Sequence, residues 1–158
     1  MAITLRPVTD DDLDALFVWE SDPRAVQMAA FTRADPSDRG AFDAHYERVL
    51  DDPTATLRAI EHDGEFVGTV GSYTMDGERE VTYWISPARW GRGLASQALQ
   101  MFLALVEPAR PIFGRVADHN AGSAKVLERA GFVATGSETS FAPGIGAEVV
   151  ERIYRLDR

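Results

Sequence analysis

The sequence predicts an α/β protein in which one mixed β-sheet is covered by helices on both faces. Three short strands follow one another between Thr56 and Ile85, and from Leu94 onward apolar residues recur at helical spacing. The predicted order is a strand, helices, three strands, a helix, a strand, a helix and two strands. The chain has 158 residues, 45% of them apolar, which is enough for one core, so we expect a single domain over residues 1–158.

The N-terminal third is predicted to contain one strand and two helices. Ile3 to Arg6 is typical of a short strand, and Thr9 is a suitable N-cap for the first helix. The second helix is expected to begin at Asp35-Pro36, because a capping aspartate followed by proline is a common helix start. The intervening residues, Ser21 to Arg33, are compatible with a plain connector or with short helical turns beside a substrate opening.

The middle of the chain is predicted to form a three-stranded meander. Its strands are Thr56 to Glu61, Phe66 to Tyr73 and Glu80 to Ile85. Asp63-Gly64 and Asp76-Gly77 separate these strands, and both pairs favour tight hairpin turns because aspartate and glycine tolerate positive φ angles.

The C-terminal half is predicted to contain two helices and three strands. Pro108 ends the helix that starts at Leu94, and Gly131 is placed to close the later helix in a left-handed conformation. The remaining predicted elements are a strand from Ile112 to Ala117, a helix from Asn120 to Ala130, and strands near Phe132 to Glu138 and Glu148 to Leu156.

The junction between the third meander strand and the following helix is typical of an anion-binding loop. It reads Trp90-Gly91-Arg92-Gly93-Leu94-Ala95, with two glycines directly before the helix. Glycines let the backbone approach an anion closely, and the free N–H groups of the helix start point at it. The chain lacks the Gly-x-Gly-x-x-Gly of dinucleotide-binding domains at this junction and the Gly-Lys-Ser/Thr of triphosphate-binding loops.

Composition excludes several classes of function. The formal net charge of -9 makes a nucleic-acid-binding surface unfavourable and fits a cationic partner or simple solubility. The chain has no cysteine, so it has no disulfide, thiolate nucleophile or thiolate zinc site, and its three histidines lack metal-ligand spacing. The sequence has no run of about 18 apolar residues, which is the length needed to span a bilayer. We expect a cytoplasmic protein without a membrane or metal partner, as a monomer or homodimer.

Three blocks, taken in this order, resemble the GNAT superfamily of acyl-CoA-dependent N-acyltransferases, and more closely its RimJ/RimL-like branch. They are the strand Glu80 to Ile85, the loop Trp90 to Ala95, and the segment Asn120 to Phe132. The resemblance implies a mostly antiparallel sheet of about seven strands with one splayed pair, flanked by about four helices. A bulge in the Glu80 to Ile85 strand is expected to open the splay.

The resemblance also implies a set of acetyl-CoA contacts. Main-chain groups of the strand end would contact the pantetheine arm, loop amides would bind the pyrophosphate, and the later helix would contribute Asn120, Ser123 and Lys125. Asn120 is also a suitable N-cap for that helix, which is compatible with a cofactor contact, and an ordinary solvated charge is the alternative for Lys125. Trp90 replaces the arginine or glutamine that usually opens the loop, which is familiar in the RimJ/RimL-like branch. The expected strand and loop contacts are Trp84, Ile85, Ser86, Gly91, Arg92, Gly93, Leu94 and Ala95.

Catalysis of acyl transfer to an amine needs a base for the amine and a hydrogen-bond donor for the leaving thiolate. Glu80 matches the position at which some family members carry the base; a salt-bridging strand end is the structural alternative, and Glu78, Asp118 and His119 are weaker candidates. Many relatives use a tyrosine for the thiolate where this chain has Leu127. Ser123 matches the serine typical of the RimJ/RimL-like branch, and the resemblance implies that it hydrogen-bonds to or protonates the CoA sulfur. The structural alternative is a residue of the first helical turn that satisfies backbone donors.

The sequence therefore predicts an acetyl-CoA-dependent N-acetyltransferase that transfers the acetyl group directly to a primary amine. The acceptor is a protein N-terminus or a small-molecule amine, and an amino-acid derivative, a polyamine and an aminoglycoside all remain open. The alternative is a non-catalytic acyl-CoA-binding regulatory module that kept the cofactor cleft.

Overall fold

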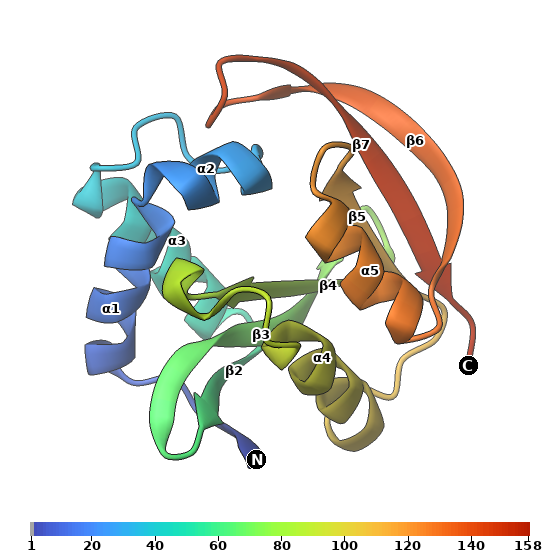
Figure 1. Cartoon of the computed structure of the whole chain (residues 1–158), viewed down its shortest axis with the longest axis horizontal. Coiled ribbons are helices and arrows are strands. Elements are labelled where there is room, and N and C mark those ends of the chain that lie inside the picture. The colour runs from blue at the N-terminus through green and yellow to red at the C-terminus, as the bar shows by residue number, and fades with distance from the viewer. Residues whose placement is uncertain (1) are drawn as a thin grey trace.

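A computed structural model describes residues 2–158. Within this range the chain forms one seven-stranded sheet with the strand order β1-β2-β3-β4-β5-β7-β6 and five α-helices packed around it (Figure 1). None of the helices in this range is long and apolar enough to cross a membrane. The predicted fold class is confirmed, with one more helix than expected.

The predicted strands are all present, and most are longer than expected. The strands are β1 (Ile3–Arg6), β2 (Thr56–His62), β3 (Glu65–Met75), β4 (Glu78–Ile85), β5 (Ile112–Ala117), β6 (Val133–Ala142) and β7 (Ala147–Leu156). The helices are α1 (Asp10–Glu20), α2 (Pro23–Ala29), α3 (Arg39–Asp51), α4 (Leu94–Leu105) and α5 (Ala121–Arg129), with a short 3-10 turn η1 (Pro87–Arg89).

The two hairpin turns and the helix ends follow the predicted local chemistry. Asp63 and Asp76 adopt positive φ angles of 52° and 51°, and each is followed by a glycine that does the same. Thr9 caps α1 in a reciprocal pair with Asp12, and Gly131 after α5 has a φ of 98°. These turns therefore form for the reasons read from the sequence.

The parallel pair β4 and β5 is splayed. All other neighbouring strands are antiparallel, whereas β4 and β5 share one register pair, Glu80 with Phe113. The predicted bulge in β4 is wrong, because β4 pairs with β3 without interruption from Glu78 to Ile85. The gap opens because each strand follows its own antiparallel neighbour, β3 for β4 and β7 for β5.

The sheet is packed on both faces. The larger core lies between the sheet and the helices α4 and α5, and it includes Leu99, Phe102 and Leu127, none of which is exposed. On the opposite face, Leu16 of α1 and Phe42 of α3 form a second cluster against the sheet. Figure 1 shows α1, α2 and α3 on one side of the central strands and α4 and α5 on the other.

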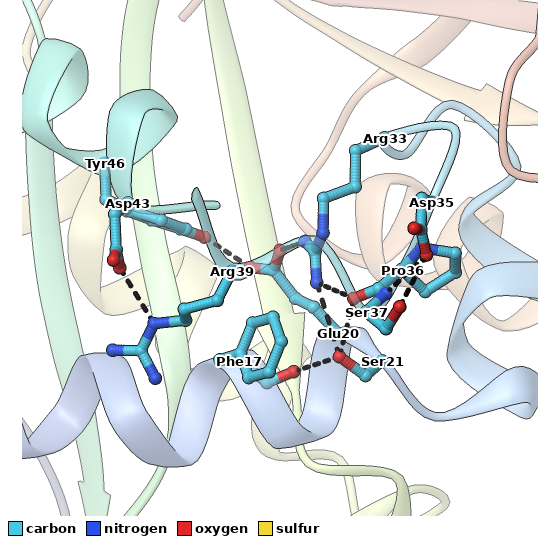
Figure 2. Close-up of polar contacts among 10 residues, drawn as sticks. All are labelled: Phe17, Glu20, Ser21, Arg33, Asp35, Pro36, Ser37, Arg39, Asp43 and Tyr46. Atoms are coloured by element: carbon cyan, nitrogen blue, oxygen red, sulfur yellow. Dashed lines mark hydrogen bonds and ion pairs between the residues drawn. The ribbon is translucent and has the colours of Figure 1, made fainter. Parts of the chain in front are cut away.

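The region from residue 21 to residue 39 differs from the prediction. Helix α2 forms in the segment for which the sequence left a plain connector and short helical turns open, with Asp22 as N-cap and Pro23 at the first position. Helix α3 begins at Arg39 with Asp38 as its N-cap, so the predicted start at Asp35-Pro36 is wrong. Asp35 instead accepts hydrogen bonds from the amide and hydroxyl of Ser37, which closes a single turn (Figure 2).

A largely buried ion pair joins α1 to the loop before α3, and a tyrosine of α3 binds to the same carboxylate. The carboxylate of Glu20 accepts hydrogen bonds from Tyr46 and from Arg33, whose guanidinium lies 2.9 Å away (Figure 2). Burial raises the pKa of the Glu20 carboxyl above its ordinary value, although both partners oppose this. The guanidinium of Arg33 also lies over the rings of Phe17 and Phe42, so one arginine fixes α1, the loop before α3, and α3.

Candidate functional site

A cleft of about 440 Å³ opens where β4 and β5 diverge. The end of β4, the loop before α4, the start of α5 and one side of α2 line it. All of the predicted cofactor residues line this cleft except Ser86. Ala25 and Met28 of α2 also line it, and the sequence had pointed to them only as part of an undetermined segment near a substrate opening.

The glycine loop leaves the start of α4 open to the cleft. Gly91 and Gly93 have φ angles of 79° and 74°, a left-handed conformation that other residues adopt at a cost. Gly93 is the N-cap of α4, and no side chain caps the helix. The first-turn amides of Leu94, Ala95 and Ser96 therefore lack partners within the helix, and all three residues line the cleft. This geometry suits an anion at the positive end of the helix dipole.

The charge of the cleft is opposite to that of the whole chain. Arg89, Arg92, Lys125 and Arg129 line it, and no aspartate or glutamate does. Arg89 forms an ion pair with Glu65. Among residues 2–158, the other three cations form no ion pair. In a chain of net charge -9, this cluster makes the cleft a site for a polyanion.

The edge of β4 offers fewer main-chain groups than predicted. The amide of Ser86 donates a hydrogen bond of 2.9 Å to the Val67 carbonyl on β3, so it faces away from the splay. Because N–H and C=O groups alternate sides along a strand, those of Ile85 and Tyr83 face the gap toward β5. The indole N–H of Trp90 donates to the Ile85 carbonyl at 2.9 Å. The Ile85 amide and the main chain of Tyr83 are therefore the groups that a ligand can use.

Ser123 and Tyr83 meet across the cleft. The Tyr83 hydroxyl lies 2.9 Å from the Ser123 carbonyl oxygen and 2.7 Å from the Ser123 hydroxyl. Burial raises the pKa of the Tyr83 phenol above its ordinary value, and the Ser123 hydrogen bond opposes this only in part. The period-two pattern of β4 places the Tyr83 side chain on the face toward α5, but its contact with Ser123 depends on packing and could not be read from the sequence.

Asn120 fixes the start of α5. Its side-chain oxygen accepts a hydrogen bond of 3.1 Å from the Ser123 amide, which is the predicted N-cap interaction. Its side-chain nitrogen donates to the Met28 carbonyl at 3.3 Å, so the start of α5 is also joined to α2. The neighbouring His119 ring lies 2.6 Å from the Gln27 carbonyl oxygen. Both contacts hold α2 against the cleft.

Leu127 belongs to the core and lies outside the cleft lining. It is fully buried, and it packs on Gly114 of β5 so closely that a Cβ at Gly114 would lie 2.7 Å from its side chain. The position at which the family resemblance places a tyrosine therefore contributes packing alone.

Glu80 lies on the opposite face of the sheet from Ser123. Tyr83 points toward α5, and because side chains alternate along a strand, Glu80 points the other way. Its carboxylate is buried, with the Tyr73 hydroxyl at 3.4 Å and the Arg115 guanidinium at 3.6 Å. Burial raises the pKa of the Glu80 carboxyl above its ordinary value, although Arg115 opposes this.

The sheet is open beside Glu80. Thr82, two residues further along β4, is exposed although β4 is the central strand of the sheet. Arg115, the cation nearest to Glu80, also contacts Glu138 at 3.0 Å and Glu151 at 3.3 Å, so three carboxylates share one guanidinium. The two faces of the splayed strands therefore differ in charge: one carries the cationic cleft, and the other carries three carboxylates around Arg115, beside the exposed Thr82.

The weaker candidates for a base lie elsewhere. Asp118 pairs with Arg152 at 2.5 Å, and Glu78 is exposed at the start of β4. Neither of these residues, nor His119, lines the cleft.

A family comparison agrees with this architecture. Residues 2–133 match the model of the acetyltransferase (GNAT) domain family. This match covers most of the chain, and the chain therefore belongs to the GNAT acetyltransferase family. Comparison with curated protein sequences gives no significant match.

Solved structures share the fold at low sequence identity. The chain is similar to aminoglycoside acetyltransferase AAC(6')-Ib in complex with coenzyme A, with a TM-score of 0.76, 20% identity, and coverage of 99% of this chain and 95% of that one. For spermidine N-acetyltransferase from Vibrio cholerae, in complex with CoA and spermine, the TM-score is 0.78 at 20% identity, with coverage of 96% of this chain and 94% of that one. For microcin C7 self immunity acetyltransferase MccE, in complex with acetyl-CoA and AMP, the TM-score is 0.79 at 15% identity, with coverage of 99% of this chain and 92% of that one.

Proposed function

We propose that this GNAT protein is an acetyl-CoA-dependent N-acetyltransferase that transfers an acetyl group directly to a primary amine, either a protein N-terminus or a small molecule. The observation that carries the proposal is the cationic cleft without a carboxylate, placed at the uncapped start of α4 and at the splay of β4 and β5. Trp90 and Ser123 further support the RimJ/RimL-like branch.

The residues of the cleft fit acetyl-CoA along its length. The amides from Gly91 to Ala95 would bind the pyrophosphate, and Arg92 with Lys125 would add positive charge near the phosphates. The main-chain groups of Tyr83 on the β5 side of β4 would bind the pantetheine arm as a surrogate strand, because the Ser86 amide is already bonded to the Val67 carbonyl. Three fold neighbours named above were solved with CoA or acetyl-CoA, which supports the same cosubstrate here.

The two faces of the sheet at the splay would bind different reactants, the thioester on one face and the amine on the other. The acetyl thioester would lie at the gap, with the Ile85 amide available for the oxyanion and Ser123 on the side of α5. The acceptor would approach over the exposed Thr82 on the other face, where Glu80 can remove the amine proton, directly or through water. The amine nitrogen then bonds to the acetyl carbon, and CoA leaves as a thiolate. The chain has no cysteine to carry a thioester intermediate, which agrees with direct transfer.

The acceptor is expected to be cationic. Glu80, Glu138 and Glu151 share one arginine on the acceptor face, so carboxylates outnumber cations there. The spermidine and aminoglycoside acetyltransferases of the same fold act on amines by name, which supports this class.

The test is release of the CoA thiol from acetyl-CoA in the presence of peptides with free N-termini, amino-acid derivatives, polyamines and aminoglycosides. Amine-dependent release, with the acetylated product identified by mass spectrometry, supports the enzyme. Gly93→Glu, which is designed to block the phosphate site, should abolish release and serves as the control. Tight CoA binding without release in any class would favour the alternative, a non-catalytic acyl-CoA-binding regulatory module, which the buried Leu127 keeps open.

A further inference from the structure

The Tyr83 hydroxyl has two contacts on Ser123 but only one proton. It lies 2.9 Å from the Ser123 carbonyl oxygen, which can only accept, and 2.7 Å from the Ser123 hydroxyl, which can donate or accept. When Tyr83 donates to the carbonyl, the Ser123 hydroxyl must donate to Tyr83. When Tyr83 donates to the Ser123 hydroxyl, the Ser123 proton is free for a partner in the cleft. The pair therefore has two hydrogen-bond arrangements with the same heavy-atom positions.

We propose that Tyr83 and Ser123 form a switchable hydrogen-bond relay that stabilises the departing CoA thiolate. The proposal rests on the proposed acetyl transfer. In the resting arrangement the Ser123 proton is held by Tyr83. As the sulfur gains charge, the Tyr83 proton turns from the Ser123 carbonyl to the Ser123 hydroxyl, and Ser123 then donates to the sulfur.

The surroundings of the pair favour a thiolate. Ser123 lies in the first turn of α5, where the helix dipole stabilises negative charge, and Asn120 fixes this turn by accepting a hydrogen bond from the Ser123 amide. Both side chains line the cleft, whereas Leu127 is buried against β5. Within residues 2–158, Tyr83 supplies the one phenol in the cleft lining.

The relay donates hydrogen bonds and transfers no proton. Burial raises the pKa of Tyr83, so a tyrosinate at this place is unfavourable and Tyr83 keeps its proton. In the reaction the amine nitrogen bonds to the acetyl carbon and the carbon–sulfur bond breaks, with its electron pair leaving on sulfur. The amine proton goes to the base on the other face, and the thiolate is protonated later by solvent. Tyr83 is thus a positioning residue for Ser123.

The experiment is a pH titration of CoA bound to the protein, followed by the ultraviolet absorbance of the thiolate. Because the chain has no cysteine, CoA supplies the only thiolate, and the same titration without CoA gives the tyrosine background to be subtracted. The wild-type protein should lower the pKa of the bound thiol by about one unit relative to free CoA, which is the scale of one charge-assisted hydrogen bond. Ser123→Ala should remove most of this shift, and Tyr83→Phe should remove a smaller part, because Ser123 then keeps its proton but loses the hydrogen bond from Tyr83 that strengthens its own donation. The double variant should lose no more than Ser123→Ala.

Two further variants separate the relay from a structural effect. Ser123→Thr keeps a hydroxyl and should retain the shift, so it tests the proposal even where Tyr83→Phe fails to fold. Tyr46→Phe removes another buried tyrosine hydroxyl, hydrogen-bonded to Glu20 outside the cleft, and should leave the bound thiol unchanged.

The outcomes distinguish this inference from the proposed function. If Tyr83→Phe binds CoA as the wild type does and the bound thiol keeps its lowered pKa, the relay is wrong while acetyl transfer stands. Additive effects of the two single variants would also overturn the relay. Failure of the wild-type protein to bind CoA at all would overturn the proposed function together with the relay.

Discussion

Substitution of Gly93 by glutamate should separate CoA binding from folding. Gly93 caps α4 with a φ of 74°, and a Cβ built there meets one atom within 4 Å, the Gln97 side-chain nitrogen at 3.8 Å. The glutamate therefore has space, and its carboxylate can take the first-turn amides that would otherwise bind phosphate. The left-handed backbone costs about 1 to 2 kcal/mol for a residue with a Cβ. A carboxylate at the helix start returns about 0.3 to 1 kcal/mol.

The loss of affinity should be much larger than the loss of stability. Each hydrogen bond to a charged group contributes about 1.5 to 3 kcal/mol, so blocking two amides costs at least about 3 kcal/mol. This corresponds to a decrease of more than about 100-fold in CoA affinity. Isothermal titration calorimetry measures the affinity, and thermal unfolding without ligand measures the stability.

Two control variants isolate the charge at the loop. Gly77→Glu adds the same side chain at a φ of 81°, with no atom within 4 Å, in the β3–β4 turn outside the cleft lining. It should carry the same backbone strain and bind CoA normally. Gly93→Ala should lose stability similarly but keep most of its affinity. If Gly93→Glu retained wild-type affinity, the assignment of the loop to phosphate would be wrong.

Three further substitutions test separate parts of the account. Glu80→Gln should lower turnover and remove the acidic limb of the pH–rate profile. In the wild type this limb should lie above the ordinary glutamate pKa, because burial raises the pKa of Glu80. An unchanged profile would exclude Glu80 as the base. Lys125→Ala should weaken CoA binding by about two- to fivefold and reduce its salt dependence, as expected for an exposed charge, whereas Arg48→Ala on α3 should change neither. Arg79→Met should cost about 3 kcal/mol in the free energy of unfolding, because it leaves the buried Glu107 carboxylate without its ion pair at 2.7 Å. Burial alone would raise the pKa of the Glu107 carboxyl, but its hydrogen bonds with Ser72 and Arg79 outweigh this, so the pKa lies below its ordinary value. The wild type should therefore have a larger free energy of unfolding than Arg79→Met at neutral pH, and the difference should shrink in acid. Equal free energies of unfolding at neutral pH, measured with denaturant, would contradict the pairing.

The strands could be predicted because their signals are local. Alternating apolar residues predict the strands of the meander, and the two Asp-Gly turns set the pairing of neighbouring strands. The helix starts were harder to predict, because Asp22-Pro23 and Asp35-Pro36 carry the same signal. Only the first begins a helix directly; at the second, a further capping aspartate, Asp38, accepts a hydrogen bond from the Ala41 amide and delays the start.

The cofactor side of the site was more predictable than the acceptor side. The glycine loop and the start of α5 are continuous segments, and the structure places both at one cleft. The hydrogen bond from the Ser86 amide to the Val67 carbonyl depends on which edge of β4 pairs with β3, and the sequence does not determine this register. The exposed Thr82 and the contact between Tyr83 and Ser123 depend equally on packing between distant elements.

A crystal structure of the protein with acetyl-CoA would test the central claim most directly. The account predicts the pyrophosphate at the amides from Gly91 to Ala95 and the pantetheine arm along the end of β4, with the sulfur beside Ser123. Binding of the nucleotide outside the cationic cleft, or a pantetheine arm that avoids the gap between β4 and β5, would contradict the account.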